Sequence, residues 1–154
     1  MTDVTDSGAD ANGRLIRILL VEDSPEDVLL TRESLKEAKV ANELLVVDDG
    51  ESALDYVHRR GDYEDAPRPD VIILDLNLPR KDGREVLLEL KEDRELKMIP
   101  IVVLTTSASE EDVMSSYEHH ANAYVRKPVT LGRFLEIAAV IDDFWLGIVT
   151  LPSR

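Results

Sequence analysis

The chain has no cysteine among its 154 residues. Disulfide bonds and thiolate metal sites are therefore excluded. It also lacks an apolar run close to the roughly 20 residues that a membrane-spanning helix needs. Residues 1–13 are polar and acidic, without the basic start and apolar core of a secretory signal. We therefore expect a cytoplasmic protein with no membrane partner.

Positive charge is scarce as well. Lysine and arginine together number 18 against 32 aspartates and glutamates, and the formal net charge is −14. Affinity for nucleic acids rests on basic side chains that neutralise the phosphate backbone, so this balance argues against a nucleic-acid partner. The chain also lacks a glycine-rich P-loop, a GxGxxG pattern and the serine elbow of hydrolases.

What the chain does have is an alternation of apolar runs and helical patterns, repeated five times after residue 13. The runs that predict strands are residues 17–22, 44–47, 71–75, 101–105 and 123–126. The first, third and fourth are continuously aliphatic, which is typical of parallel strands covered on both faces. The sequence therefore predicts a doubly wound α/β fold, with a five-stranded parallel sheet and five flanking helices.

Polar side chains follow these strands where each one ends. They are Glu22 and Asp23, Asp75, Thr105 with Thr106, and Lys127. Because the carboxyl ends of parallel strands meet at one edge of the sheet, these side chains should form a pocket for a cation and a phosphate. Three carboxylates offer the hard oxygen ligands that suit Mg²⁺.

The sequence also predicts helix starts at Ser24-Pro25 and at Asp49-Gly50. The expected apolar face of the first helix consists of Val28, Leu29, Leu35 and Ala38.

A simpler interpretation treats the acids at the strand ends as helix caps. It accounts well for Asp48, Asp49 and Asp112, which precede expected helices. It accounts poorly for Asp75, because no helix start follows that residue directly. For Lys127 the simpler interpretation is a solvated loop lysine, which the acids predicted nearby make the weaker choice.

These residues, in this order, resemble the receiver domain of two-component response regulators. The resemblance covers residues 17–141. It rests on Ile18-Leu-Leu-Val-Glu22-Asp23, Asp75-Leu-Asn-Leu-Pro79 with Asp82-Gly83, Thr105, Tyr124 and Lys127-Pro128. It implies a flavodoxin-like sheet with strand order 2-1-3-4-5.

The resemblance also implies roles for the acidic residues. Asp75 would be the phosphoacceptor, a carboxylate nucleophile that takes a phosphoryl group from a kinase phosphohistidine. Glu22, Asp23 and Asp75 would hold Mg²⁺, with the backbone carbonyl of Asn77 as a further ligand. Glu22 stands where aspartate is commoner in the family, which lengthens one arm of the metal site.

The remaining implied roles concern the phosphoryl group and the switch. Lys127 would neutralise charge on the phosphoryl oxygens, and Thr105 would hydrogen-bond them. Thr106 is larger than the usual residue there, so access to Asp75 would be narrower. Tyr124 would turn inward after phosphorylation and change the face formed by strand 4, helix 4 and strand 5. Pro128 is expected to follow a cis peptide bond.

The C-terminal end resembles small regulators paired with cyanobacterial phytochrome kinases, in which an extension contributes to a homodimer. We therefore divide the chain into a disordered tail (1–13), a receiver domain (14–143) and an apolar extension (144–154). The large apolar residues of the extension either cover the domain's own core or form a dimer contact, which we favour. They are Phe144, Trp145, Leu146, Ile148, Val149 and Leu151.

Together these features predict a stand-alone response regulator that catalyses only its own phosphorylation and dephosphorylation. Its donor would be a sensor histidine kinase, phytochrome-like or of another multidomain type. A His-phosphotransfer protein or an effector would act downstream. Two alternatives stay open: a Mg²⁺-dependent phosphohydrolase with an aspartate nucleophile, and a dimeric interaction module that needs no phosphorylation.

Overall fold

The computed structural model describes residues 3–4, 16–37, 42–106, 121, 123–127, 130 and 132. Its strands are β1 (Asp3–Val4), β2 (Ile16–Val21), β3 (Asn42–Val47), β4 (Val71–Asp75), β5 (Ile101–Thr105) and β6 (Ala123–Arg126). Its helices are α1 (Pro25–Glu37), α2 (Gly50–Val57) and α3 (Gly83–Glu92), with 3-10 turns η1 (Gly61–Tyr63) and η2 (Leu96–Met98). The last three predicted strands are confirmed with their predicted bounds, and the first two differ by one or two residues at their ends.

The strands form one sheet in the order β1-β3-β2-β4-β5-β6. The five strands from β3 to β6 are parallel to their neighbours. This is the order 2-1-3-4-5 that the sequence predicted, so the doubly wound fold is confirmed. The register places Leu74 beside Val21 and Asp75 beside Leu104, so the carboxyl ends of the central strands meet at one edge.

The sixth strand was not predicted. β1 pairs antiparallel with β3, with Asp3 opposite Leu44 and Val4 opposite Glu43. These residues lie in the segment that we expected to be a disordered tail, and that expectation is wrong for Asp3 and Val4. A sequence pattern of two residues carries no strand signal, because edge pairing depends on the neighbour that the fold supplies.

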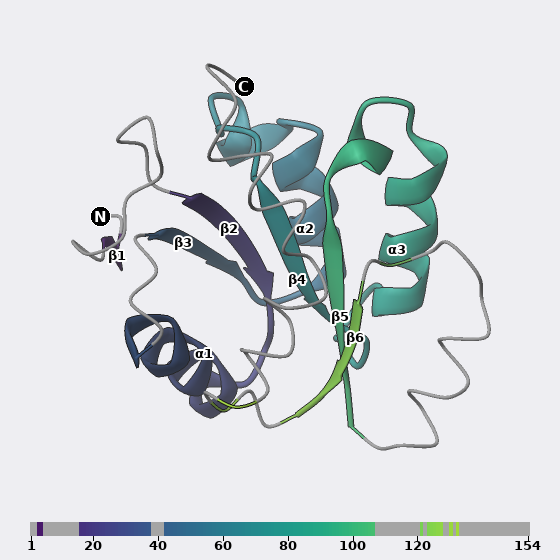
Figure 1. Cartoon of the computed structure of the whole chain (residues 1–154). Helices are drawn as coiled ribbons and strands as arrows, with labels where there is room; N and C mark the ends of the chain where they lie inside the picture. The colour runs from purple at the N-terminus through teal and green to yellow at the C-terminus, as the bar shows by residue number, and fades with distance from the viewer. Residues whose placement is uncertain are drawn as a thin grey trace.

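Helices cover both faces of the sheet (Figure 1), with α1 on one face and α2 and α3 on the other. Along β2, Leu19 and Val21 pack into the core with α2 and α3, whereas Ile18 and Leu20 pack into the core with Leu35 of α1. Successive side chains of a strand point to opposite faces. The central strands β2, β4 and β5 are apolar at nearly every position because both faces of the sheet are covered there.

Capping residues set where the helices begin. The hydroxyl of Ser24 accepts a hydrogen bond from Asp27 N at 3.3 Å at the start of α1, where Pro25 is the first helical residue as predicted. The carboxylate of Asp49 accepts from Ser52 N at 2.7 Å, and that of Asp82 accepts from Arg84 N at 2.8 Å. The cap interpretation of Asp49 is therefore confirmed.

Two predicted features of the helices need comment. Leu29 was expected on the inner face of α1, but 57% of its surface is exposed. The buried residues of α1 are Thr31, Ser34 and Leu35, of which Leu35 was expected. The predicted fourth and fifth helices lie mainly outside the described residues, as does Asp112. Within the described part, no helix is long and apolar enough to cross a bilayer.

Candidate functional site

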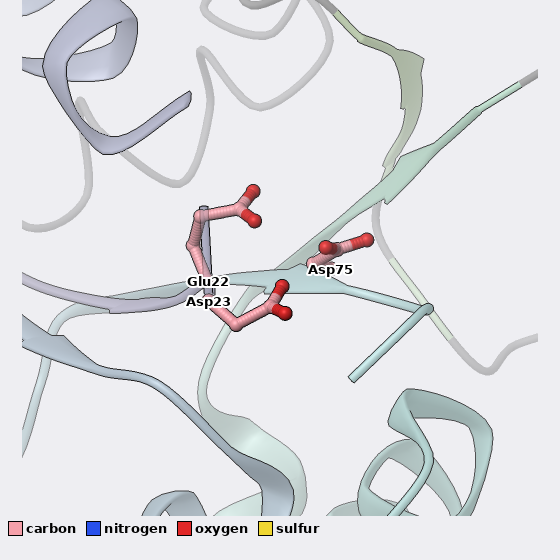
Figure 2. Close-up of side chains that lie close together, drawn as sticks. All are labelled: Glu22, Asp23 and Asp75. Carbon is pink, nitrogen blue, oxygen red and sulfur yellow. The ribbon is translucent and has the colours of Figure 1, made fainter. Parts of the chain in front are cut away.

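Three carboxylates meet at the carboxyl edge of the central strands. Glu22 and Asp23 follow β2 directly, and Asp75 is the last residue of the neighbouring strand β4. Each offers an oxygen within 4.8 Å of the others (Figure 2). We call these three residues the acidic cluster. The strand-end convergence predicted from the sequence is confirmed for them.

The members of the acidic cluster differ in their exposure to solvent. Glu22 and Asp75 are each only 1% exposed, whereas Asp23 is exposed. Glu22 and Asp23 are consecutive, so the strand's alternation directs one inward and leaves the other at the surface. The cluster therefore combines two desolvated carboxylates with one that water and ions can reach.

Lys127 is the cation at the centre of this arrangement. Its Nζ lies 2.9 Å from Glu22 Oε1, 2.9 Å from Asp75 Oδ2 and 2.9 Å from Asp27 Oδ2. The lysine follows β6, and its backbone N donates to Thr105 O at 2.8 Å, which fixes the start of its side chain beside β5. The solvated-lysine alternative is thus excluded by the structure.

Asp27 is the member of this group that sequence reasoning missed. Its position in the first turn of α1 gives it an obvious role as a helix-terminus acid, so nothing set it apart. Only the folded chain brings Lys127, which follows β6, to the first turn of α1. The available signal in the sequence was the place of Asp27 in the first helical turn after the end of β2, close to Glu22 and Asp23.

Backbone groups hold the two buried carboxylates in place. Ser24 N donates to Glu22 Oε2 at 3.2 Å, and Asn77 N donates to Asp75 Oδ1 at 3.1 Å. Lys127 Nζ donates a hydrogen bond to Glu22 Oε2 at 3.1 Å, and the buried Glu22 Oε1 lies 2.9 Å from the same ammonium without an aligned hydrogen bond. Oε1 is thus compensated by the charge of a cation alone, and a metal ion would be a suitable further partner for it.

The burial and crowding of these charges alter their protonation. Burial raises the pKa of Glu22 from 4.5 to about 7, against the lowering effect of the Lys127 hydrogen bond, and the charge of Asp75 raises it further. For Lys127, burial would lower the pKa, but its hydrogen bonds with Glu22, Asp27 and Asp75 raise it above the usual value. The Lys127 ammonium therefore stays charged beside the Glu22 carboxylate, which is protonated more readily than an ordinary glutamate.

The predicted phosphoryl-binding residues lie around this centre. Thr105 is fully buried, and its hydroxyl donates a long hydrogen bond of 3.5 Å to Val125 O. Thr106 and Asn77 are exposed, and Tyr124 is half-buried. Burial raises the pKa of the Tyr124 hydroxyl. In this structure the Thr105 hydroxyl is thus bonded to the backbone of β6.

Other predicted residues lie outside the described part of the chain. They are Pro128 and the extension residues Phe144, Trp145, Leu146, Ile148, Val149 and Leu151. The cis peptide bond and the dimer contact therefore stay predictions.

The loop after Asp75 is tied to α2 and α3. Arg80, which has a positive φ of 65°, pairs with the buried carboxylate of Asp49 at 3.4 Å. Burial alone would raise the pKa of Asp49, but hydrogen bonds from Ser52 and the charge of Arg80 lower it. Gly50 lies against the carbonyl of Lys81, where a side chain would collide. The loop is therefore held against the start of α2.

Known proteins give this geometry a context. The response regulator receiver domain family matches residues 18–139 of the chain. The response regulator Rcp1 of Synechocystis sp. is 50% identical over 136 residues, which are 88% of this chain and 92% of that protein.

Solved structures show the same likeness. The Mn²⁺-bound form of Rcp1 aligns with a TM-score of 0.72 and 49% identity, over 90% of this chain and 99% of that one. The phosphorylated cyanobacterial phytochrome response regulator RcpA aligns with a TM-score of 0.73 and 47% identity, again over 90% and 99%. With a family match across most of its length, this chain belongs to the response regulator receiver domains.

Proposed function

We propose that this chain is a phosphorylation switch that takes a phosphoryl group on Asp75 from the phosphohistidine of a sensor kinase. The single observation that carries this proposal is the contact between Lys127 Nζ and the buried carboxylate of Asp75 at 2.9 Å. An aspartate held beside a fixed ammonium is both oriented and supplied with charge for the arriving phosphoryl oxygens. Structural aspartates at strand ends need no such partner.

The residues present suit a divalent cation. Glu22 Oε1 is buried without a hydrogen bond, and the acidic cluster brings three carboxylates within 4.8 Å. All donors are hard oxygens, and no thiolate is available, so Mg²⁺ is the metal that they fit best. Glu22, Asp23 and Asp75 would hold it, with the carbonyl of Asn77. When bound, Mg²⁺ would supply positive charge opposite the phosphoryl oxygens.

The transfer itself uses one carboxylate oxygen of Asp75. That oxygen forms a bond to phosphorus as the P–N bond of the donor phosphohistidine breaks. The imidazole nitrogen keeps the electron pair and takes a proton from water, and an acyl phosphate remains on Asp75. Lys127 orients the attacking carboxylate and accompanies the negative charge that arrives with the phosphoryl group. Thr105 would leave Val125 and donate its hydroxyl to the product, while Thr106 at the surface narrows the approach.

The response would pass from the site to β5 and β6. Thr105 and Tyr124 lie on these neighbouring strands, with Val103 of β5 beside Tyr124 of β6. Rotation of Thr105 removes its bond to β6, and Tyr124 could then turn inward and alter the surface that a partner recognises. We place this reaction in the cytoplasm, where kinases have ATP. A homodimer through residues 144–154 and a further His-phosphotransfer or effector partner complete the proposal.

The kinase is proposed to belong to the phytochrome class. Support comes from RcpA, described as a phytochrome response regulator, which is 47% identical to this chain. Rcp1 in its Mn²⁺-bound form likewise supports a divalent cation in the acidic cluster.

Intact mass spectrometry tests the proposal. The full chain with Mg²⁺ and acetyl phosphate should gain one phosphoryl group, and Asp75→Asn should gain none. Asp70→Asn is the matched control, since Asp70 is a buried aspartate at the other end of β4 and accepts from Arg17 N at 2.8 Å. Continuous release of phosphate from many esters would instead indicate a phosphohydrolase. If the chain gains no phosphoryl group and releases no phosphate, an interaction module would be indicated.

A further inference from the structure

Asp27 is an acid at the site that neither metal binding nor phosphoryl transfer accounts for. It lies in the first turn of α1, and its carboxylate is 2.9 Å from Lys127 Nζ. About a quarter of its side chain is exposed, at 26%, against 16% for Lys127. The contact joins the start of α1 to Lys127, which follows β6, and these two segments are far apart in the sequence.

Helix capping does not explain where the Asp27 side chain lies. Asp27 occupies the third helical position after the cap Ser24, where an acid ordinarily reaches back to the backbone N–H of the cap. Here Ser24 N donates to Glu22 Oε2 at 3.2 Å instead. The Asp27 backbone is held by its own bond to Ser24 Oγ at 3.3 Å. The carboxylate is thus released from capping and lies on the lysine.

The three carboxylates around Lys127 differ in what else they would bind. Glu22 and Asp75 are the residues that a cation and a phosphoryl group would engage. Their charges would then be shared, and their hold on the ammonium would weaken. Asp27 lies outside the acidic cluster, so its charge stays available to Lys127 throughout.

We propose that Asp27 is a positioning residue that anchors the Lys127 ammonium beside Asp75 while the other two carboxylates serve the metal and the phosphoryl group. This proposal rests on the proposed function of Asp75. An anchored ammonium keeps one N–H on Asp27 and presents the others to the phosphoryl oxygens. A lysine without the anchor would spend more time in other rotamers, and the transfer would lose orientation.

A metal-free measurement tests the anchor directly. Urea unfolding with EDTA is compared for wild type, Asp27→Asn, Lys127→Met and the double variant. We expect the Asp27→Asn loss to shrink strongly in the Lys127→Met background, since the anchored partner is gone. Glu26→Gln is the matched control, because Glu26 is an exposed acid in the same helical turn. An Asp27→Asn loss of equal size in both backgrounds would contradict the anchor.

Phosphorylation rates test the consequence. With Mg²⁺ and acetyl phosphate, Asp27→Asn should be phosphorylated about two- to fivefold more slowly than wild type, the size of effect that one partly exposed ion pair gives. Glu26→Gln should stay close to wild type, and Asp27→Asn should add no further slowing to Lys127→Met. If wild type gains a phosphoryl group and Asp27→Asn gains it as fast, only the positioning role is wrong. If wild type gains none, the proposed function itself fails.

Discussion

Gly83 packs against the backbone of Asp75 so closely that no side chain fits between them. A Cβ built on Gly83 would collide with the carbonyl oxygen of Asp75 and would lie 2.6 Å from Leu76 Cα. The approach is completed by a hydrogen bond of 3.0 Å from Gly83 N to Leu76 O. In the sequence, Gly83 stands out only as part of the Asp82-Gly83 motif. The structure gives Gly83 a function in setting α3 against β4, the strand that ends in Asp75.

Substituting this glycine should disturb both stability and the site. Gly83→Ala places a methyl group against backbone atoms that cannot rotate away, so we expect a loss of about 1–3 kcal/mol in the free energy of unfolding. Phosphorylation of Asp75 should slow as well, because the end of β4 must shift. Urea unfolding and intact-mass kinetics measure the two effects. Gly61→Ala is the control, since Gly61 has open space around it and only the strain of a positive φ of 58°. A smaller loss in Gly83→Ala than in that control would refute the packing argument.

Removal of the Lys127 charge should destabilise the metal-free protein. Lys127→Met leaves Glu22 and Asp75 buried without their cation, and breaking a buried pair in this way costs about 3 kcal/mol. Mg²⁺ should restore part of this loss, because it supplies the missing positive charge. Urea unfolding with EDTA and with Mg²⁺ measures both effects. Lys97→Met, at an exposed lysine of η2, should change little under either condition.

Glu22 should make the stability of the metal-free protein depend on pH. Its pKa is about 7 in the folded state against 4.5 ordinarily, so between these values the folded chain binds more protons than the unfolded one. Stability from this residue therefore falls as pH rises from 4.5 to 7 and is level above and below that window. Glu22→Gln removes the titration, so its stability relative to wild type should rise across the same window.

The measurement is the difference in unfolding free energy between wild type and Glu22→Gln from pH 4 to pH 8 in EDTA, at about one-unit steps. Glu26→Gln serves as control, because Glu26 is an exposed acid close to Glu22 in sequence, in the first turn of α1. A Glu22→Gln difference that stays constant with pH would show that Glu22 titrates normally. Added Mg²⁺ should reduce the pH dependence, since the metal favours the charged carboxylate.

Substitution of Asp23 should weaken metal binding without lowering the stability of the metal-free protein. Its carboxylate belongs to the acidic cluster but is exposed, so Asp23→Asn removes a ligand without leaving a buried charge. We expect Mg²⁺ affinity to fall by at least about tenfold, with unfolding in EDTA almost unchanged. Calorimetric titration measures the affinity, and the rise of Tm with Mg²⁺ gives a second measure. Asp62→Asn, an exposed acid of η1, should bind Mg²⁺ as wild type does.

The helix starts show how far local sequence patterns reached. Ser24-Pro25 and Asp49-Gly50 were recognised as starts, because capping needs only residues near in sequence, and both are confirmed. The expectation that Leu29 faces inward was wrong, because the inner face of α1 depends on how the helix lies on the sheet. β1 was missed for a similar reason, since its partner β3 lies about 40 residues away in the chain.

Composition and order along the chain decided the fold class and brought Glu22, Asp23, Asp75 and Lys127 forward as one group. Continuous apolar runs bury both faces of a strand, and parallel strands send their ends to one edge, so these inferences need no coordinates. Tertiary packing decided the rest. It turned Asp27 from a helix-terminus acid into a partner of Lys127, left Glu22 Oε1 buried without a hydrogen bond, and made Gly83 a point of contact with Asp75. Each depends on distances between segments remote in sequence, which only the packed chain sets.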